Sequence, residues 1–384
     1  MADKTVLVLG GGIGGVAGAS LLKEKLGNRA RVRLVERKKR FAFPPSYPWL
    51  MLGLRTPDAI QRDYRSLAAK GIDVVQGDVT SLDVGEKSVR TTKGDLSYDY
   101  LLVALGAEYA PETVPGFSEH AHHIYDLDSA MRFKNAIEGF QGGTIAVGVA
   151  RLPFKCPAAP YEVAVLLDDW YTRKGTRGKV KLEFFTPEGA PMPAAGPDIG
   201  GQVAGLLASR GINYRPKRKL TEIGPRELRF EGGETLSYDL LFCVPPHRAP
   251  KPVVDAGLAD GTGWIPVNSA TMETKVPGVY AVGDVTAIPT PNGYVPFLPK
   301  AGVFAHGQAE TAANRIAMEI KGRGKAKEWD GHGACFLEVG RGQSAYVTGN
   351  FLAAPKPDLA FHMPGKVWHM QKVLFERHWF NRWF

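Results

Sequence analysis

The sequence predicts an α/β protein made of two βαβ units in tandem, followed by a C-terminal region of different character. An apolar strand, a glycine loop and a helix open the chain, a similar strand pattern returns about 140 residues later, and the end is aromatic and basic. The length of 384 residues exceeds what one packed core usually holds, since domains average roughly 150 residues. Hydrophobic residues make up 44% and charged residues 23%, which excludes a disordered or fibrous chain.

The first unit begins with a strand at residues 5–9, a run of glycines at 10–15, a helix at 16–25 and a second strand at 32–35. A glycine loop between a strand and a helix places backbone N–H groups where they bind the phosphates of a dinucleotide. The order therefore predicts a Rossmann-like, dinucleotide-binding unit.

Within this loop, Gly10, Gly12 and Gly15 match the spacing G-x-G-x-x-G, and Glu36 closes the second strand. The first glycine permits the tight turn, the second lets the backbone approach a pyrophosphate, and the third lets helix pack on strand. Glu36 is placed to accept hydrogen bonds from the ribose of an adenosine. The basic run that starts at Arg37 is typical of a solvated turn, although it could also face the adenosine phosphates.

The chain then repeats part of its pattern. Leu-Ser-Tyr-Asp occurs at 96–99 and again at 236–239, each time before an apolar strand. The strand sequence Thr-Val-Leu-Val at 5–8 likewise resembles Thr-Ile-Ala-Val at 144–147. Chance identity of a tetrapeptide is the alternative, but the matched strand context favours a second Rossmann-like unit.

The second unit lacks the features that would bind a nicotinamide cofactor. Its first strand leads into residues 148–157, where a proline-flanked Cys156 replaces the glycine loop. Its second strand, at 180–185, ends in phenylalanine where the first unit has a glutamate, although Glu183 and Glu188 lie close by. The sequence therefore predicts a unit without a competent nicotinamide site, which instead brings Cys156 to the cofactor of the first unit.

Two further segments resemble flavoproteins with two dinucleotide-binding domains. Pro-Gly-Val-Tyr-Ala-Val-Gly-Asp at 277–284 resembles their second flavin fingerprint, and Leu-Leu-Val-Ala-Leu-Gly-Ala at 101–107 resembles the return strand beside the FAD domain. The resemblance implies FAD as the resident cofactor, with its ribitol chain held by the aspartate. It adds four residues to those expected to contact FAD: Ala104, Gly106, Gly283 and Asp284.

Several other segments carry a closer resemblance: 41–49, Cys156 with Pro157, 160–162, 244–246, 299–302 and Cys335. Across essentially the whole chain the sequence is similar to sulfide:quinone oxidoreductase and to the flavoprotein subunit of flavocytochrome c sulfide dehydrogenase. The resemblance implies that Cys156 and Cys335 form a disulfide or polysulfide bridge beside the flavin. Hydrosulfide would open this bridge, leaving a persulfide on Cys335 and a thiolate on Cys156 that adds to the flavin. A membrane quinone would then accept the electrons.

The positions of two charged residues suggest roles for them beside the sulfur and the flavin. Glu162 lies near the start of a predicted helix and could move protons beside the sulfur chemistry, with a solvated glutamate as the alternative. Lys300, with the helix predicted at 302–318, could stabilise the negative charge of reduced flavin. Cys243 lies in an apolar strand, which predicts a core residue.

The cysteine pattern also departs from the related families. No cysteine lies near residues 43–45, where flavocytochrome c relatives attach FAD, so the flavin is expected to be non-covalent. No third cysteine lies at 107–155, which argues against a long polysulfide cycle. A flavocytochrome c type subunit, a type II NADH:quinone dehydrogenase and a non-catalytic redox sensor remain alternatives.

We expect the FAD-binding domain at 1–110 and 251–320, the second domain at 111–250, and a C-terminal region at 321–384. The tail at 366–384 is aromatic and basic, and on a helical wheel it places Trp368 with three other aromatic residues: Phe375, Trp379 and Trp383. This pattern predicts a peripheral, monotopic protein on the cytoplasmic face of the membrane. Packing of the tail on its own domain, or on another subunit of a homo-oligomer, is the alternative.

The net charge and the histidines do not predict a nucleic-acid-binding site or a metal site. The net charge is +9, but no recognisable nucleic-acid-binding module carries it. His120, His122 and His123 cluster without a carboxylate or cysteine at ligand spacing, so no metal site is expected. The opening strand leaves no room for a secretory signal, and no uncharged apolar run reaches about 18 residues.

Overall fold

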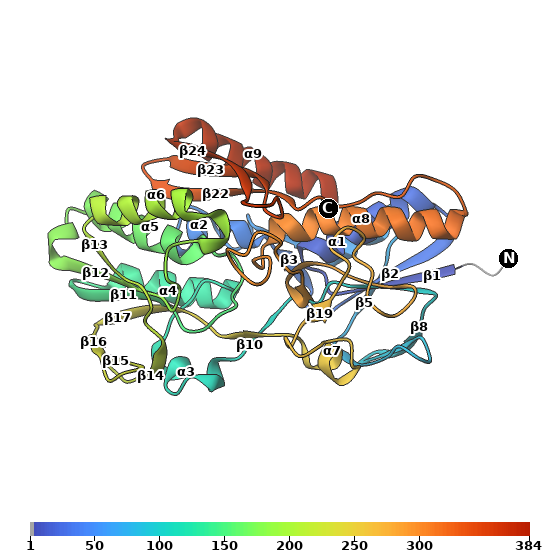
Figure 1. Cartoon of the computed structure of the whole chain (residues 1–384), viewed down its shortest axis with the longest axis horizontal. Coiled ribbons are helices and arrows are strands. Elements are labelled where there is room, and N and C mark those ends of the chain that lie inside the picture. The colour runs from blue at the N-terminus through green and yellow to red at the C-terminus, as the bar shows by residue number, and fades with distance from the viewer. Residues whose placement is uncertain (1–3) are drawn as a thin grey trace.

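The computed structural model describes residues 4–384, and two parallel sheets with their helices form most of the protein (Figure 1). The sheet of the first unit has the strand order β20-β9-β1-β2-β5, with every neighbouring pair parallel. Its strands are β20 (Val279–Ala281), β9 (Tyr100–Val103), β1 (Lys4–Leu9), β2 (Ala30–Glu36) and β5 (Asp73–Gln76). Helices α1 (Ile13–Leu26) and α8 (Gly302–Lys321) pack against each other on one face.

The second unit has a smaller parallel sheet with the order β13-β12-β11-β17. Its strands are β13 (Ile212–Arg215), β12 (Val180–Phe185), β11 (Gly143–Val149) and β17 (Leu240–Val244). Three helices accompany them: α4 (Leu127–Gly139), α5 (Ala159–Arg173) and α6 (Pro197–Ser209). The predicted tandem of Rossmann-like units is confirmed.

The two units also share a detail that the repeated tetrapeptide encodes. In the first unit, Asp99 accepts a hydrogen bond from the backbone N–H of Thr5 at 2.8 Å. In the second unit, Asp239 accepts from the backbone N–H of Thr144 at 2.9 Å. Each aspartate therefore ties the start of its unit's first strand to the turn before a neighbouring strand.

An antiparallel sheet accompanies each unit, and two short strands connect the units. The antiparallel sheets consist of β6 (Val79–Asp83), β7 (Ser88–Thr91) and β8 (Gly94–Ser97), and of β14 (Leu220–Ile223), β15 (Glu227–Phe230) and β16 (Thr235–Ser237). The chain leaves the first unit through β10 (Glu108–Tyr109) and returns through β18 (His247–Arg248), which pair antiparallel. The smaller elements are β3 (Arg40–Ala42), α2 (Tyr47–Met51), β4 (Gln61–Asp63), α3 (Phe117–His120), α7 (Lys251–Asp255), β19 (Ile265–Pro266) and β21 (Thr286–Ala287).

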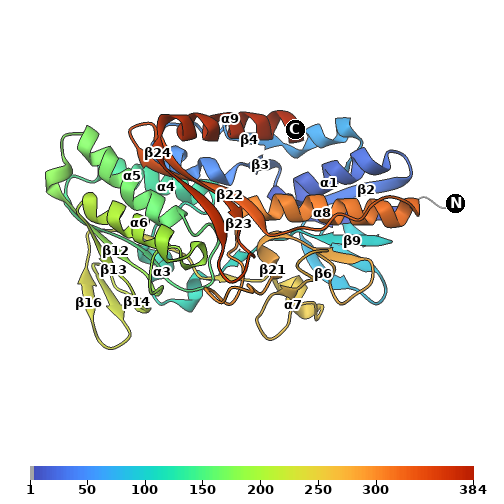
Figure 2. The same ribbon diagram turned by 45° about the horizontal axis from the view of Figure 1, so that its top comes forward.

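The C-terminal region lies across both units, as the red elements of Figures 1 and 2 show. It contains an antiparallel sheet of β22 (His332–Gly340), β23 (Gln343–Asn350) and β24 (Asp358–Gly365), followed by α9 (Lys366–Trp383). Strand β22 packs against α5 of the second unit, and α9 packs against β23 and α1. This region therefore brings residues of both units together.

The core follows the alternation of side chains along the central strands. Val6 and Val8 of β1 face the layer of α1 and α8, whereas Leu7 and Leu9 face the opposite side of the sheet, and all four are fully buried. A parallel strand covered on both faces needs this unbroken apolar run. Among residues 4–384, no helix combines the length and apolar character needed to cross a bilayer.

The tail forms a helix, but its aromatic face is turned inward. Trp379 and Trp383 are buried with Phe380 in the same apolar cluster as Phe41 and Phe43. The Trp379 ring stacks on the Phe43 ring at 5.7 Å between centroids. The prediction that these tryptophans face a membrane is therefore wrong, because the first domain provides an apolar surface that buries them. The alternative, packing of the tail on its own domain, holds for this face.

Candidate active site

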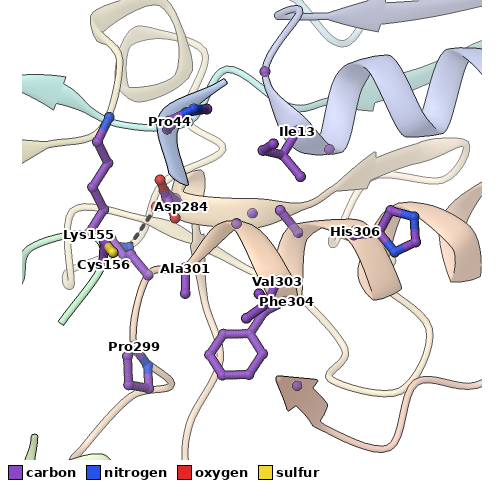
Figure 3. Close-up of a pocket in the computed structure, with 18 of the residues that line it drawn as sticks. Ile13, Pro44, Lys155, Cys156, Asp284, Pro299, Ala301, Val303, Phe304 and His306 are labelled. Atoms are coloured by element: carbon purple, nitrogen blue, oxygen red, sulfur yellow. Dashed lines mark hydrogen bonds between the residues drawn. The ribbon is translucent and has the colours of Figure 1, made fainter. Parts of the chain in front are cut away.

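A large cavity of about 2340 Å³ lies between the two units and the C-terminal region. It extends from the glycine loop of the first unit, past Cys156 and Cys335, to the inner face of α9. Figure 3 shows Cys156 and Lys155 near Asp284 in this cavity, with Ile13 at the start of α1 on the other side. Other predicted site residues on its wall are Gly10, Gly12, Glu36, Arg37, Ala104, Gly106, Glu162, Gly283 and Lys300.

The glycine loop has the geometry that its spacing predicts. Gly10 has a φ of +91°, and a Cβ on Gly15 would lie 1.7 Å from the carbonyl oxygen of Gly10. A side chain at either position is therefore excluded by the fold itself. Gly12 differs, because a Cβ there would meet no atom within 4 Å and would point into open space. Glu36 turns toward the loop and accepts a hydrogen bond from the N–H of Gly11 at 2.6 Å.

Tyr64 contacts the glycine loop at Gly11, and this contact was not predicted from the sequence. Its hydroxyl donates to the carbonyl oxygen of Gly11 at 2.6 Å, and a Cβ on Gly11 would lie 2.6 Å from the tyrosine ring. Gly11, which the motif leaves free, is therefore fixed as glycine by a ring 53 residues away in sequence. Nothing in the local pattern indicates this contact.

Asp284 lies on the cavity wall with one carboxylate oxygen unsatisfied. Its Oδ1 is buried and has no hydrogen-bond partner among residues 4–384, and burial raises the pKa of Asp284. A buried acceptor without a partner is costly unless a ligand completes it. The neighbouring Lys300 donates to the backbone oxygens of Asp284 at 2.7 Å and Thr286 at 3.2 Å. Burial lowers the pKa of Lys300 to about 8.

Cys156 is held by a contact between the two units. Its backbone N–H donates to the carbonyl oxygen of Lys300 at 2.7 Å, and its φ is +55°. A left-handed conformation is rare for cysteine and persists where the surroundings enforce it. Cys156 is exposed and lines the cavity. The adjacent Lys155 donates to the hydroxyl of Tyr109 at 2.7 Å.

Cys335 reaches the same cavity from β22, where it pairs with Val347 of β23. Both cysteines are free thiols in this structure. Burial raises the pKa of Cys335 to about 11 and raises the pKa of Cys156 as well, with the negative charge of Glu162 adding to both effects. The predicted bridge between the two cysteines remains a prediction.

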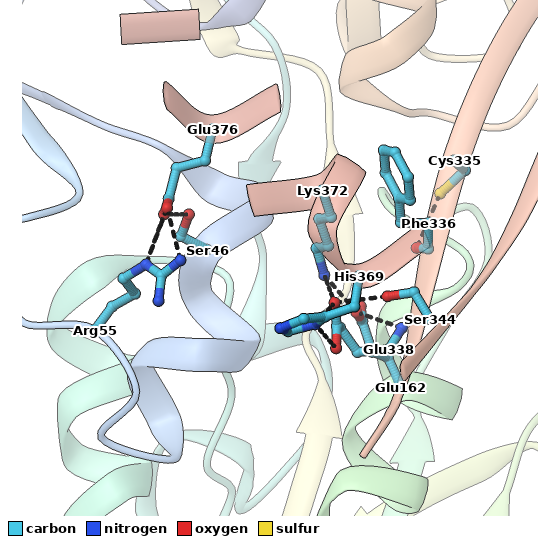
Figure 4. A network of polar contacts seen from close by, with 10 residues as sticks. All are labelled: Ser46, Arg55, Glu162, Cys335, Phe336, Glu338, Ser344, His369, Lys372 and Glu376. Atoms are coloured by element: carbon cyan, nitrogen blue, oxygen red, sulfur yellow. Dashed lines mark hydrogen bonds and ion pairs between the residues drawn. The ribbon is translucent and has the colours of Figure 1, made fainter. Parts of the chain in front are cut away.

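A buried ionic network lies on the same side of the cavity as Cys335 (Figure 4). Glu162 accepts hydrogen bonds from Lys372 at 2.7 Å and from the backbone N–H of Glu338 at 3.0 Å. Glu338 in turn contacts His369 at 3.0 Å and accepts from Ser344 at 2.6 Å. Burial raises the pKa of Glu162, although Lys372 opposes this effect. Glu162 is 4% exposed, so the alternative of a solvated glutamate is wrong.

The comparisons with known proteins agree with this geometry. Residues 4–314 match the family model described as pyridine nucleotide-disulphide oxidoreductase. The chain belongs to this family. The family assignment confirms the predicted flavoprotein with FAD as its cofactor.

Within the pyridine nucleotide-disulphide oxidoreductase family, the chain is similar to proteins named for sulfide and quinone. It is 26% identical to the mitochondrial sulfide:quinone oxidoreductase of mouse over 93% of this chain and 80% of that protein. It is 25% identical to the sulfide-quinone reductase of Aquifex aeolicus over 98% of this chain and 90% of that protein. The crystal structure of the Aquifex aeolicus sulfide:quinone oxidoreductase superposes with a TM-score of 0.90 at 23% identity, covering 99% of this chain and 91% of that chain.

The residues of this family member fit FAD. The open space above Gly12 and Gly106 would admit phosphate and ribose close to the backbone. The unsatisfied Oδ1 of Asp284 can accept a hydroxyl of the ribitol chain. The start of α1, with its unpaired N–H groups, faces the same part of the cavity and favours negative charge.

Other residues singled out in the sequence lie outside the reacting centre. Glu183 is paired with Arg215 at 2.8 Å inside the second unit. Glu188 lines the cavity, where burial raises its pKa to about 7 and the hydroxyl of Tyr161 donates to it at 2.9 Å. Cys243 is fully buried in β17, as predicted. Arg37 lies near Asp78 at 3.9 Å and stays largely exposed.

The open position at Gly12 and the crowded position at Gly15 lead to a first prediction. We expect Gly12→Ala to fold but to retain little FAD after purification, because its methyl group occupies only the space for the cofactor. Gly15→Ala is expected to destabilise the protein itself, because its Cβ collides with Gly10. Flavin absorbance per protein and thermal unfolding of the apoprotein separate the two effects. Full flavin content in Gly12→Ala would contradict the placement of the cofactor.

Proposed function

We propose that this protein is an FAD-dependent sulfide:quinone oxidoreductase in which Cys156 and Cys335 act as a redox pair. The observation that carries the proposal is that two cysteines from different parts of the fold open into the cavity that also holds the glycine loop and Asp284. The relatives from mouse and Aquifex aeolicus bear this activity in their names. The second unit offers no glycine loop for a nicotinamide cofactor.

The sulfur chemistry starts from a bond between the two cysteines. Hydrosulfide attacks the sulfur of Cys335, a new S–S bond forms there, and Cys156 leaves as a thiolate with the electron pair of the broken bond. The persulfide hydrogen is released as a proton. A second hydrosulfide or another thiol then removes the outer sulfur from Cys335. Closure of the Cys156–Cys335 bond releases two electrons, for which bound FAD supplies the acceptor.

Burial and a neighbouring ammonium have opposite effects on the ionisation of the two cysteine thiols. Burial disfavours a thiolate, as the raised pKa of both cysteines indicates. The ammonium of Lys372 counters this effect at both thiols. Lys372 therefore stabilises the thiolate that leaves, while Glu162 lies on the cavity wall to receive a proton. In this proposal Lys300 keeps the Asp284 loop in place beside the flavin.

The quinone is proposed to reach the cavity at its C-terminal end. There the walls are aromatic, with Phe336, Tyr346 and Phe375 exposed to the cavity. The outer face of α9 and the strand before it carries four exposed apolar residues: Met363 at 67%, Val367 at 57%, Met370 at 61% and Leu374 at 54%. We propose that this face, rather than the buried tryptophans, rests on the membrane surface from which the quinone enters.

Anaerobic sulfide tests the proposed activity directly. We expect sulfide to bleach the flavin absorbance of the purified protein and a short-chain quinone to restore it. Bleaching by NADH but not by sulfide would contradict the proposal and favour a type II NADH dehydrogenase. Transfer to a cytochrome in preference to quinone would favour a flavocytochrome c type subunit.

The membrane face gives a second prediction. Changing Met370 and Leu374 to glutamate places two charges on the exposed side of α9, away from the buried face. We expect this variant to lose at least about tenfold in binding to phospholipid vesicles, since burying each charge costs more than about 1.4 kcal/mol. Sedimentation with vesicles measures the change.

Val254 provides a matched control for the membrane face. It is 49% exposed on α7, so Val254→Glu changes apolar surface to charge at another place on the protein. This control is expected to bind vesicles as the unaltered protein does. Equal loss in both variants, or no loss in either, would contradict the assignment of α9 to the membrane.

A further inference from the structure

The ionic network beside the cysteines reaches from the cavity to the protein surface. Glu162 and Lys372 line the cavity. Glu338 lies behind them, buried, with Lys372 at 3.8 Å and His369 at 3.0 Å. The side chain of His369 is 30% exposed. Every step from cavity to solvent is therefore a contact between groups that can bind a proton.

One additional proton would make this network electrically neutral. Two carboxylates, Glu162 and Glu338, face one ammonium, Lys372, so the sum is −1 when His369 is neutral. Burial alone disfavours the ammonium, but the two carboxylates outweigh it and raise the pKa of Lys372. An additional proton would therefore neutralise a buried negative charge, which low dielectric surroundings favour. The imidazole of His369 is suited to exchange such a proton with water.

In the part of the chain that the structure describes, the other groups that contact Glu338 and His369 carry no positive charge. Ser344 of β23 donates to Glu338, and the edge of the Trp49 ring of α2 meets His369 at 5.8 Å between centroids. Arg55, whose guanidinium carbon lies 4.4 Å from the centroid of the Trp49 ring, is already paired with Glu376 at 2.9 Å. Among residues 4–384, the basic side chains within 4 Å of the Glu338 carboxylate are therefore Lys372 and His369, both of which come from α9.

We propose that Glu338 and His369 carry the proton released at the cysteines to solvent, receiving it through Glu162 and Lys372. This inference rests on the proposed oxidation of sulfide, in which the persulfide loses a proton when the Cys156–Cys335 bond is opened, before the reduction of bound FAD would take one up again. Glu338 and His369 touch neither sulfur nor flavin in this scheme, so they act as relay residues. In this proposal α9 supplies two of the four groups that carry the proton, Lys372 and His369.

The test follows the reductive half-reaction of the FAD-loaded protein. Sulfide is mixed anaerobically in weak buffer, and a pH-indicator dye records the proton released before the flavin absorbance bleaches, with both signals followed together. In His369→Ala we expect proton release to slow by about tenfold, and added imidazole to restore it, since the surface position lets imidazole take the place of the side chain. Glu338→Gln should show the same delay without rescue by imidazole, because its site is buried.

Controls separate a relay from a structural role. His362 lies on neighbouring β24 and packs against Trp368 at 4.5 Å between ring centroids. It is not part of the ionic network that contains His369, so His362→Ala should release protons at the unaltered rate. His369→Gln keeps the approximate size of the side chain, so it can be measured if the alanine variant does not fold. Proton release at the unaltered rate in His369→Gln, or a defect in folded His369→Ala that imidazole does not restore, would overturn the relay. Failure of sulfide to bleach the unaltered protein would instead overturn the proposed function.

Discussion

Replacement of Cys335 by serine is expected to abolish reduction of the flavin by sulfide, with turnover falling about a thousandfold or more. A serine hydroxyl cannot form the bond to Cys156 that hydrosulfide opens, so no electrophilic sulfur remains. The protein itself should fold, because Cys335 faces the cavity and is only partly buried. Anaerobic titration with sulfide, read from the flavin absorbance, measures the loss.

Cys243 provides the control for this experiment. It is fully buried in β17 and does not line the cavity, so Cys243→Ala should retain turnover within a few-fold while losing some stability. FAD content should be unchanged in both variants. Full sulfide turnover in Cys335→Ser would contradict the paired-cysteine mechanism. The absence of sulfide-dependent bleaching in the unaltered protein as well would favour a non-catalytic redox sensor.

The fold could be predicted because its main features are local in sequence. The glycine spacing at Gly10, Gly12 and Gly15 needs a strand before it and a helix after it, and both are present. The repeated tetrapeptide predicts two units because Asp99 and Asp239 each tie down the first strand of a unit. These patterns depend on backbone hydrogen bonds and on the periodicity of apolar residues, which a single sequence records.

The ionic network could not be predicted, because its partners are far apart along the chain. Glu162 meets Lys372 across 210 residues and Glu338 across 176. No spacing rule connects α5, β22 and α9, and charged residues in a sequence are usually solvated. The role suggested for Glu162 follows from its position shortly after Cys156, whereas Glu338 and His369 come near it only because the C-terminal region lies across both units.

The partner of the aromatic face of the tail could not be predicted for a related reason. Helical periodicity placed Trp368, Trp379 and Trp383 on one face, but periodicity alone does not say whether such a face meets lipid or protein. Phe41 and Phe43, some 340 residues earlier in the sequence, form the surface that buries two of these tryptophans. The exposed stripe that includes Met370 and Leu374 is less aromatic and gave a weaker sequence signal.

Lys372→Met is expected to lower the free energy of unfolding by about 3–5 kcal/mol. Methionine keeps the length of the side chain and removes its charge, which leaves Glu162 and Glu338 as two buried carboxylates without a cation. Both lie in surroundings that already disfavour negative charge. Urea unfolding of the FAD-loaded protein, followed by tryptophan fluorescence, measures the change. Lys366→Met, at the exposed start of α9, should change the unfolding free energy by less than about 0.5 kcal/mol.

The double variant Glu162→Gln with Lys372→Met tests the cause of this loss. If unpaired charge is responsible, the second change should recover part of the stability, because one carboxylate no longer needs a cation. If lost packing against Trp49, whose ring lies 4.7 Å from the ammonium, is responsible, the two losses should add. Recovery would show that unpaired charge causes the loss, and that α9 is held to α5 of the second unit and to β22 by the same groups that are proposed to carry protons from the cysteines.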